Sequence, residues 1–306
     1  MAAIGSELRR SPAPAVVELA AQLAARAPGH AVAVLFYGSA LRTGLQDGVL
    51  DYYVLLDDVG AWPAPRLATL ANRILPPNVS YLEARLGDAT LRAKVAVMSL
   101  AQFTKGVSAN SIDTTLWARF SQPCACVWAR SADCQNAVAE AVCKATVTAA
   151  HWAALLGPDR GDALDYWRAL YARTYGAELR VESALRGKEL LAGETARYAR
   201  LLPGAWKALG IAFDADANGI LRPRLSRRDR ARAARRWALR RRLGKLLNLL
   251  RLIKSAFTFE GAMDYVVWKV ERHSGVRLEV SPWQRRHPLL AAPGLYWRLR
   301  RLGLLR

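Results

Sequence analysis

The chain has 306 residues, 52% of them hydrophobic, so it can bury a full core and we expect more than one domain. Its 45 lysines and arginines outnumber its 25 aspartates and glutamates, and the formal net charge of +20 indicates a polyanionic partner: a nucleic acid, an anionic membrane or a phosphorylated substrate. The chain contains no run of about 18 uncharged apolar residues, so we expect no membrane-spanning helix.

The first segment and the cysteines both indicate a cytoplasmic protein. Residues 1–26 are predicted to form a helix, with Val16, Leu19 and Leu23 on one apolar stripe. The segment contains two glutamates and lacks a hydrophobic core followed by a cleavage site, so we do not expect a secretory signal. The four cysteines occur at intervals that match no usual zinc pattern, which favours free thiols in a reducing compartment.

The region from residue 31 to about 130 alternates between strands and helices. Its apolar runs are short and are separated by turn residues, as is typical of strands. The predicted strands cover residues 31–37, 50–56, 79–83, 92–98 and 124–128. We therefore predict an α+β fold, with a mixed sheet and flanking helices in residues 1–130.

A Gly-Ser pair, Gly38-Ser39, follows the first predicted strand, and Asp51 opens the second. Glycine lets the backbone approach phosphate oxygens, and Ser39 with the start of a helix offers donors to an anion. Asp51, which we expect to face this turn, would share a Mg²⁺ ion with nucleotide phosphates. This pattern is typical of nucleotidyltransferases and predicts nucleotide binding at Tyr37, Gly38 and Ser39. The alternative is an ordinary turn followed by a strand cap.

The second metal ligand is harder to place. Many nucleotidyltransferases carry another carboxylate two residues after the first, and here that residue is Tyr53. Asp57 lies about 20 Å from Asp51 along an extended strand, which is too far to share an ion. We therefore take Glu83, on another predicted strand, as the second ligand. The alternative is a surface carboxylate on an edge strand.

From about residue 135 the periodicity becomes helical. Predicted helices cover residues 137–156, 163–175, 178–192 and 195–209, and a turn-rich run covers 213–219. We predict three parts: a nucleotidyltransferase-like domain in 1–130, a mainly helical domain in 131–225 and a basic amphipathic region in 226–306.

The third part begins with a strongly basic helix. Between Arg222 and Lys254 there is a single acid, Asp229, among many lysines and arginines. An apolar stripe also recurs at intervals of three and four residues: Leu239, Leu243, Leu246, Leu250, Ile253 and Phe257. The helix could pack its stripe on the domain, lie on an anionic membrane surface, or form a nucleic-acid arm. Residues 295–306 combine aromatics, leucines and arginines without an acid, so we expect the membrane surface as partner and no nucleic acid.

Several segments resemble the mitochondrial-type phosphatidate cytidylyltransferases, also called the mitochondrial translocator assembly and maintenance family. The segments 36–40 and 50–58, followed by Ala61-Trp62, are similar to that family's Tyr-Gly-Ser-Gly, Asp-Phe-hydrophobic, Asp-Asp and Ala-Trp elements. Residues 91–99 and 116–123 match two further family segments, and 254–258 match a third more loosely. Two departures concern phosphate contacts: Ala40 replaces a usual glycine and Gln122 a usual lysine.

The resemblance implies an enzyme that joins CTP to phosphatidic acid with Mg²⁺, releasing pyrophosphate and forming CDP-diacylglycerol. Asp51 would hold the metal, while Lys94 and Arg119, on matching segments, would supply positive charge to the substrate phosphate. The alternative for both cations is a surface salt bridge. The enzyme would be cytoplasmic and peripheral on the inner face of the membrane. Two other functions stay open: a nucleotidyltransferase acting on RNA or a small soluble acceptor, and a degenerate, non-catalytic member that binds membrane.

Overall fold

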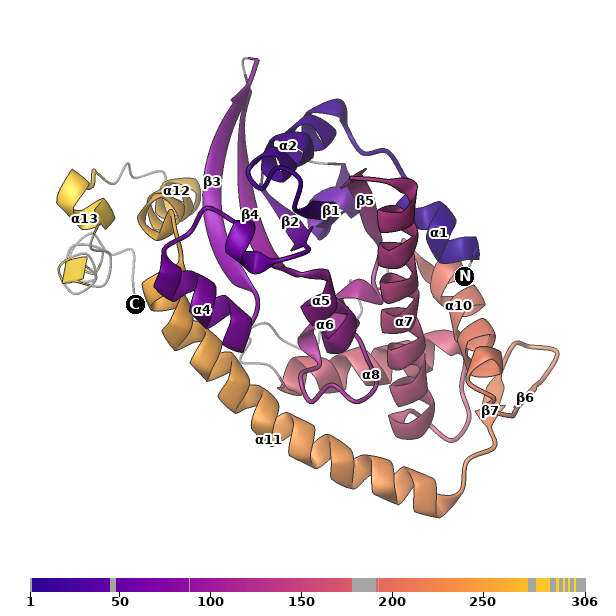
Figure 1. Ribbon diagram of the computed structural model, residues 1–306. Helices are drawn as coiled ribbons and strands as arrows, with labels where there is room; N and C mark the ends of the chain where they lie inside the picture. The colour runs from indigo at the N-terminus through magenta and orange to yellow at the C-terminus, as the bar shows by residue number, and fades with distance from the viewer. Residues whose placement is uncertain are drawn as a thin grey trace.

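The computed structural model describes residues 2–44, 48–87, 89–177, 191, 193–274 and 279–286, together with positions 290, 291, 294, 297 and 300. Within these residues a five-stranded mixed sheet, in the order β3-β4-β2-β1-β5, forms the centre of the molecule (Figure 1). Its strands are β1 (Ala31–Tyr37), β2 (Val49–Leu56), β3 (Asn78–Leu86), β4 (Ala89–Ser99) and β5 (Cys124–Ala129). Among the neighbouring strands of the described residues, only the pair β2 and β4 is parallel. All five predicted strands are present, which confirms the α+β fold with a mixed sheet.

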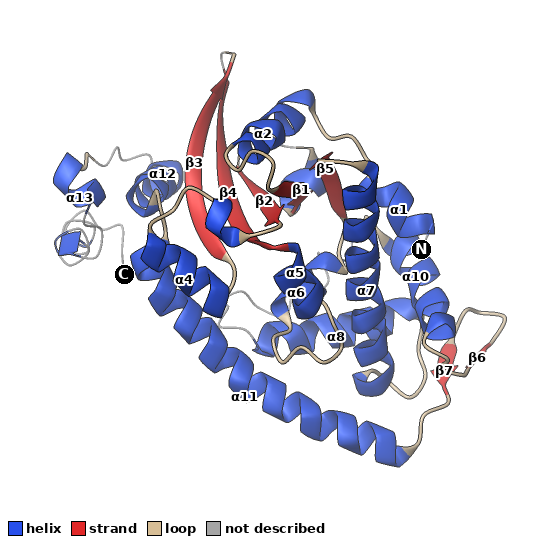
Figure 2. Cartoon of the chain, viewed as in Figure 1, coloured by secondary structure: helices blue, strands red, loops and turns tan. Residues whose placement is uncertain are grey.

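Alternation along the strands divides the core into two clusters, one on each face of the sheet. On one face, Leu50, Tyr52 and Val54 pack against helix α2 (Pro14–Ala25). On the other face, Tyr53 and Leu55 pack beneath most of the remaining helices (Figure 2). These are α1 (Ala2–Leu8), α5 (Leu100–Gly106), α6 (Thr115–Phe120), α7 (Ala132–Leu156), α8 (Ala163–Ala177) and α10 (Thr195–Ala208).

The second cluster joins the sheet to the helical part of the chain. Its largest fully buried side chains include Trp117 of α6, Trp152 of α7 and Trp167 of α8. The boundary predicted near residue 130 lies inside this cluster, and the division into three domains stays a prediction. The predicted helices 137–156, 163–175 and 195–209 correspond to α7, α8 and α10. Of the predicted helix over 178–192, only Leu191 lies within the described residues.

One local prediction differs from the structure. The predicted helix over residues 1–26 is divided into α1 and α2, because Pro12 and Pro14 interrupt the chain between them and Pro14 can only begin a helix. The turn predicted within 213–219 is present. It closes a small hairpin of β6 (Phe213–Ala215) and β7 (Leu221–Pro223), and the Asp216 side chain accepts hydrogen bonds from its backbone. The smaller elements beside the sheet are α3 (Ser39–Thr43), the 3-10 turn η1 (Val59–Ala61) and α4 (Arg66–Ile74).

The basic segment forms the long helix α11 (Arg227–Thr258), which runs along the edge of the molecule and passes α4 (Figure 1). Its predicted apolar stripe does not pack on the body: Leu239, Leu246 and Phe257 are 54%, 51% and 73% exposed. The side that packs instead contains Ala233, Trp237, Arg240 and Gly244. Helices α12 (Ala262–Ser274) and α13 (Pro282–Arg286) follow. Within the described part of the chain, no helix is long and apolar enough to cross a membrane.

Arg240 shows why α11 packs in this orientation. Its guanidinium donates to the carbonyls of Ala109 and Ser111 at 2.9 and 3.1 Å and lies 4.4 Å from the ring centroid of Trp152. Burial, and then the charge of Arg236, lower the pKa of Arg240 to about 10. Arg240 is therefore a packing residue rather than part of an exposed basic surface.

Candidate active site

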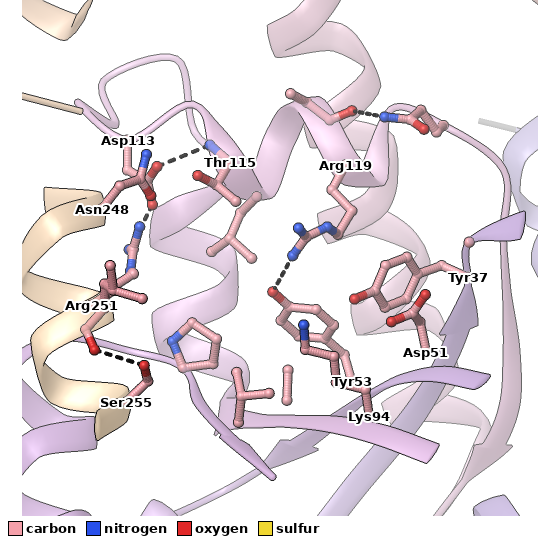
Figure 3. Close-up of a pocket in the computed structure, with 18 of the residues that line it drawn as sticks. Tyr37, Asp51, Tyr53, Lys94, Asp113, Thr115, Arg119, Asn248, Arg251 and Ser255 are labelled. Atoms are coloured by element: carbon pink, nitrogen blue, oxygen red, sulfur yellow. Dashed lines mark hydrogen bonds and ion pairs between the residues drawn. The ribbon is translucent and has the colours of Figure 1, made fainter. Parts of the chain in front are cut away.

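A cavity of about 690 Å³ opens between the sheet, α6 and the C-terminal half of α11 (Figure 3). This volume is in the range of small-molecule and cofactor sites. One side, the sheet wall, comes from β1, β2, β4 and α6 and contains Tyr37, Gly38, Ser39, Asp51, Tyr53, Lys94 and Arg119. The other side, the α11 wall, contains Asp113, Asn248, Arg251, Lys254 and Ser255. The sheet wall thus brings together six of the seven predicted site residues, all except Glu83.

The turn between β1 and α3 brings bare backbone against Asp51. Gly38 has a φ of 97°, a left-handed value that favours glycine. A Cβ built at this position would lie only 2.7 Å from Asp51 Oδ2. The register pairs Tyr37 with Asp51 across the two strands, which confirms that Asp51 faces the Gly38-Ser39 turn. Because α3 has only five residues, an anion here would depend on backbone N–H groups and the Ser39 hydroxyl more than on a helix dipole.

Lys94 stands beside Asp51 in the sheet. The parallel pairing of β2 and β4 places the two residues opposite each other. Paired residues of neighbouring strands emerge on the same face of a sheet, about 5 Å apart. An acid and a base therefore lie next to each other on the sheet wall, where the cavity begins.

Tyr53, at the position where a second carboxylate was sought, holds a cation instead. Its side chain is 1% exposed, and its hydroxyl accepts a hydrogen bond of 2.8 Å from Arg119 of α6. The Arg119 guanidinium also lies 5.3 Å from the ring centroid of Tyr37. Rings of Tyr37, Tyr53 and Phe120 pack against one another below it. Arg119 is thus fixed over the sheet wall by a hydroxyl and an aromatic face.

Glu83 is not part of this arrangement. It lies on the edge strand β3, which β4 separates from β2, so two strand spacings or about 10 Å divide it from the row of Asp51. Its carboxylate accepts hydrogen bonds from the Tyr81 hydroxyl at 2.8 Å and from Arg92 at 3.2 Å. The prediction of Glu83 as a ligand sharing a metal with Asp51 is not supported by this geometry. The alternative, an edge-strand carboxylate in a surface ion pair, describes it.

The donor set fits a metal that arrives with a nucleotide. Among the described residues, no three His, Cys, Asp or Glu side chains form a group that could hold an ion. Mg²⁺ at nucleotide sites takes one or two carboxylates and completes its coordination with phosphate oxygens and water. Asp51, placed against the glycine backbone, supplies one such carboxylate. The residues present therefore fit Mg²⁺ bound together with phosphates, and not a metal enclosed by protein ligands alone.

The α11 wall contains a buried ion pair that the sequence did not reveal. Asp113 lies 2.6 Å from Arg251 and accepts a hydrogen bond of 3.0 Å from the Thr115 backbone. Burial alone would raise the pKa of the Asp113 carboxyl, but the Arg251 charge and these hydrogen bonds together hold it below its ordinary value. The two residues are far apart in the chain, and no local spacing marks them as partners.

Lys254 attaches α11 to the turn that precedes β3. Its ammonium donates to the carbonyls of Leu75 and Pro77 at 2.5 and 2.6 Å and to Asn78 Oδ1 at 3.1 Å. Burial, and next the charge of Arg251, lower the pKa of Lys254 to about 8. Lys254 belongs to segment 254–258, which shows the loosest of the sequence resemblances, and its contacts indicate a structural role.

Comparison with known proteins adds little to this geometry. No family model matches the chain, and no curated protein matches it in sequence. Among solved structures, it is similar to a nucleotidyltransferase-like protein from Exiguobacterium sibiricum, with 13% identity and a TM-score of 0.27 over 94% of this chain and 91% of the other. A TM-score this low carries no argument about function.

Proposed function

We propose that the protein is a nucleotidyltransferase that joins CTP to phosphatidic acid at a membrane surface, forming CDP-diacylglycerol and pyrophosphate. The observation that carries the nucleotidyl transfer is the position of Asp51, whose Oδ2 lies 2.7 Å from where a Gly38 Cβ would be. A carboxylate against bare backbone can share a metal with phosphates that the backbone binds. The choice of CTP and phosphatidate depends on the sequence resemblance, and so does a peripheral position on the inner, cytoplasmic membrane face.

Each residue of the sheet wall has a role in this reaction. Gly38 and Ser39 would bind the triphosphate through backbone N–H groups and the Ser39 hydroxyl. Mg²⁺ at Asp51 would neutralise charge on the phosphates. Lys94 and Arg119 would orient the phosphate of phosphatidate, whose oxygen forms a new bond to the α-phosphorus of CTP while the bond to the bridging oxygen breaks and pyrophosphate leaves. Such a transfer depends on positioning and charge neutralisation rather than on a covalent enzyme intermediate.

The test is a direct assay with the full chain. Radiolabelled CTP, Mg²⁺ and vesicles containing phosphatidate are incubated together, and the lipid is then extracted. We expect the label in CDP-diacylglycerol, and only when both Mg²⁺ and phosphatidate are present. Vesicles that lack phosphatidate serve as the control. Label that appears instead in RNA or in a water-soluble product, or no transfer by folded protein, would contradict the proposal.

A further inference from the structure

The outer side of α11 changes its chemistry along the helix. Its N-terminal half presents mainly exposed arginines, namely Arg228, Arg232, Arg235 and Arg242, with Leu239 among them. Its C-terminal half presents apolar residues that are 43–73% exposed: Leu246, Leu249, Leu250, Ile253 and Phe257. Intervals of three and four residues place these side chains on one side of the helix. A cationic line thus continues into an apolar one.

The inner side of α11 is already occupied, so the apolar side has no place on the body. Trp237, Arg240 and Gly244 are buried against the helical layer, while Arg251 and Lys254 bond to the segment before β3. An amphipathic helix of a soluble protein ordinarily turns its apolar stripe inward. Here Arg240, Arg251 and Lys254 face inward, and the leucines face outward. Exposed apolar surface of this kind indicates an interaction site.

Helix α4 carries a second row of exposed apolar residues, which we include in the same surface. It lies beside the C-terminal half of α11, and the Leu75 carbonyl at its end receives the hydrogen bond from Lys254 (Figure 1). Its residues Leu67, Leu70 and Ile74 are 72%, 53% and 75% exposed. We call these three residues, with Leu246, Leu249, Leu250, Ile253 and Phe257, the α4–α11 apolar face.

The cavity opens next to this face. Leu252 lines the cavity and is nevertheless 64% exposed. Its neighbours Leu249 and Ile253 belong to the α4–α11 apolar face. A molecule with an anionic head and an apolar chain, held on this face, would therefore have its head close to the cavity opening.

We propose that the α4–α11 apolar face is the surface by which the protein docks on an anionic lipid bilayer, with the arginines of the N-terminal half of α11 against the headgroups. Apolar residues beside cations on one helix are the pattern that binds such interfaces. A second copy of this chain fits poorly, because Asp229, in the first turn, is the single acid of α11. In a pair of copies the arginines would meet other arginines or leucines. Docking itself does not require the proposed reaction, although a lipid substrate would explain the cavity opening at Leu252.

The decisive experiment measures vesicle binding by the full chain, without CTP or phosphatidate, so that a failed transferase assay does not affect it. The vesicles are phosphatidylcholine with about 30% phosphatidylglycerol, which gives an anionic surface. The test variant combines Leu246→Ser, Ile253→Ser and Phe257→Ser, and its matched control carries Met at the same three positions. We expect the serine variant to bind about tenfold more weakly, and the methionine variant within about twofold of wild type, because methionine keeps the apolar surface.

Unchanged binding by a folded serine variant would overturn the proposal. If that variant also changed from dimer to monomer in sedimentation velocity, the occupant would be a second copy instead.

A second variant, with Leu67→Ser, Leu70→Ser and Ile74→Ser, tests α4 and is expected to bind about three- to tenfold more weakly. Binding as strong as that of the wild type would show that α4 is not part of the docking surface. Replacing Arg232, Arg235 and Arg242 with serine should weaken binding at low ionic strength only, because salt screens the charges and leaves apolar burial. An equal loss at high salt would contradict the assignment of these arginines to headgroups.

Discussion

The two walls of the cavity use charge in different ways. On the sheet wall, Asp51 lies beside Lys94 in the register of the strands and against the Gly38 backbone, at the end of the sheet. On the α11 wall, Asp113 and Arg251 are paired with each other, and Lys254 is bonded to three oxygens of the neighbouring turn. In the proposed reaction the charges of the sheet wall act on the substrates, whereas those of the α11 wall hold the helix in place. Substitutions that separate turnover from stability test this division.

The largest effect is expected from Asp51→Asn on the sheet wall. The amide keeps the shape of the side chain but loses the charge that would hold Mg²⁺, so turnover should fall by about two to three orders of magnitude. The melting temperature should change little, because the substitution is nearly isosteric. Turnover in the CTP–phosphatidate assay and thermal unfolding measure the two quantities. Near-normal turnover would show that the metal is bound elsewhere.

Gly38→Ala tests the close approach of backbone and carboxylate. Its Cβ would lie 2.7 Å from Asp51 Oδ2, so the carboxylate must move, and a displacement of about 1 Å in such a site costs about 100-fold in rate. Gly44→Ala is the matched control, because Gly44 also has a positive φ, +72°, but no atom within 4 Å of its built Cβ. Both variants should lose about 1 kcal/mol of stability from backbone strain. Equal turnover in the two variants would show that the close approach of the Gly38 backbone to the Asp51 carboxylate is not needed for the reaction.

Asp113→Asn on the α11 wall should give the opposite pattern. The substitution leaves Arg251 without its partner, and the two side chains are only 14% and 20% exposed. Breaking a buried pair in this way costs about 3 kcal/mol of unfolding free energy. Chemical denaturation measures the loss, and turnover per folded molecule should fall far less than in Asp51→Asn. If the variant were as stable as the wild type but its turnover fell as far as in Asp51→Asn, the α11 wall would take part in catalysis.

The sheet wall could be predicted because its signals are local. A run of apolar residues, a Gly-Ser turn and an acid at the start of the next strand lie within about twenty positions, and backbone geometry brings them together. Lys94 and Arg119 were predicted from the resemblance, and both side chains line the cavity. The prediction of Glu83 as a metal ligand is not supported, because the position of a strand in the sheet is set by pairing between segments that are distant in the sequence. In the sequence, Tyr53 was noted only because it occupies the position of an expected second carboxylate. Its hydrogen bond to Arg119 of α6 joins residues 66 positions apart and has no local sequence signal.

Apolar periodicity also has a limit that α2 and α11 make plain. In α2, Val16, Leu19 and Leu23 are at most 2% exposed against the sheet, as expected of a stripe. In α11 the stripe is equally regular, yet it faces outward, because Arg240, Arg251 and Lys254 find carbonyl and carboxylate partners on the body. Periodicity identifies a stripe, but the partners of the other faces decide which side is buried.

The smallest expected effect comes from the titration of Lys254. Its pKa is lowered from 10.5 to about 8 in the folded protein, so between these values the unfolded chain binds more protons than the folded one. Relative to Lys254→Met, the unfolding free energy of the wild type should therefore rise as the pH increases from 8 to 10.5, and level off on either side. The full shift corresponds to about 3 kcal/mol, which solvent screening of this part-exposed group reduces to about 1–2. Denaturation curves of both proteins across this range measure the difference. If the difference in unfolding free energy did not change with pH, the three oxygens around the ammonium would stabilise its charged form as strongly as burial destabilises it. The charge of Lys254 would then not lower the stability of the folded protein.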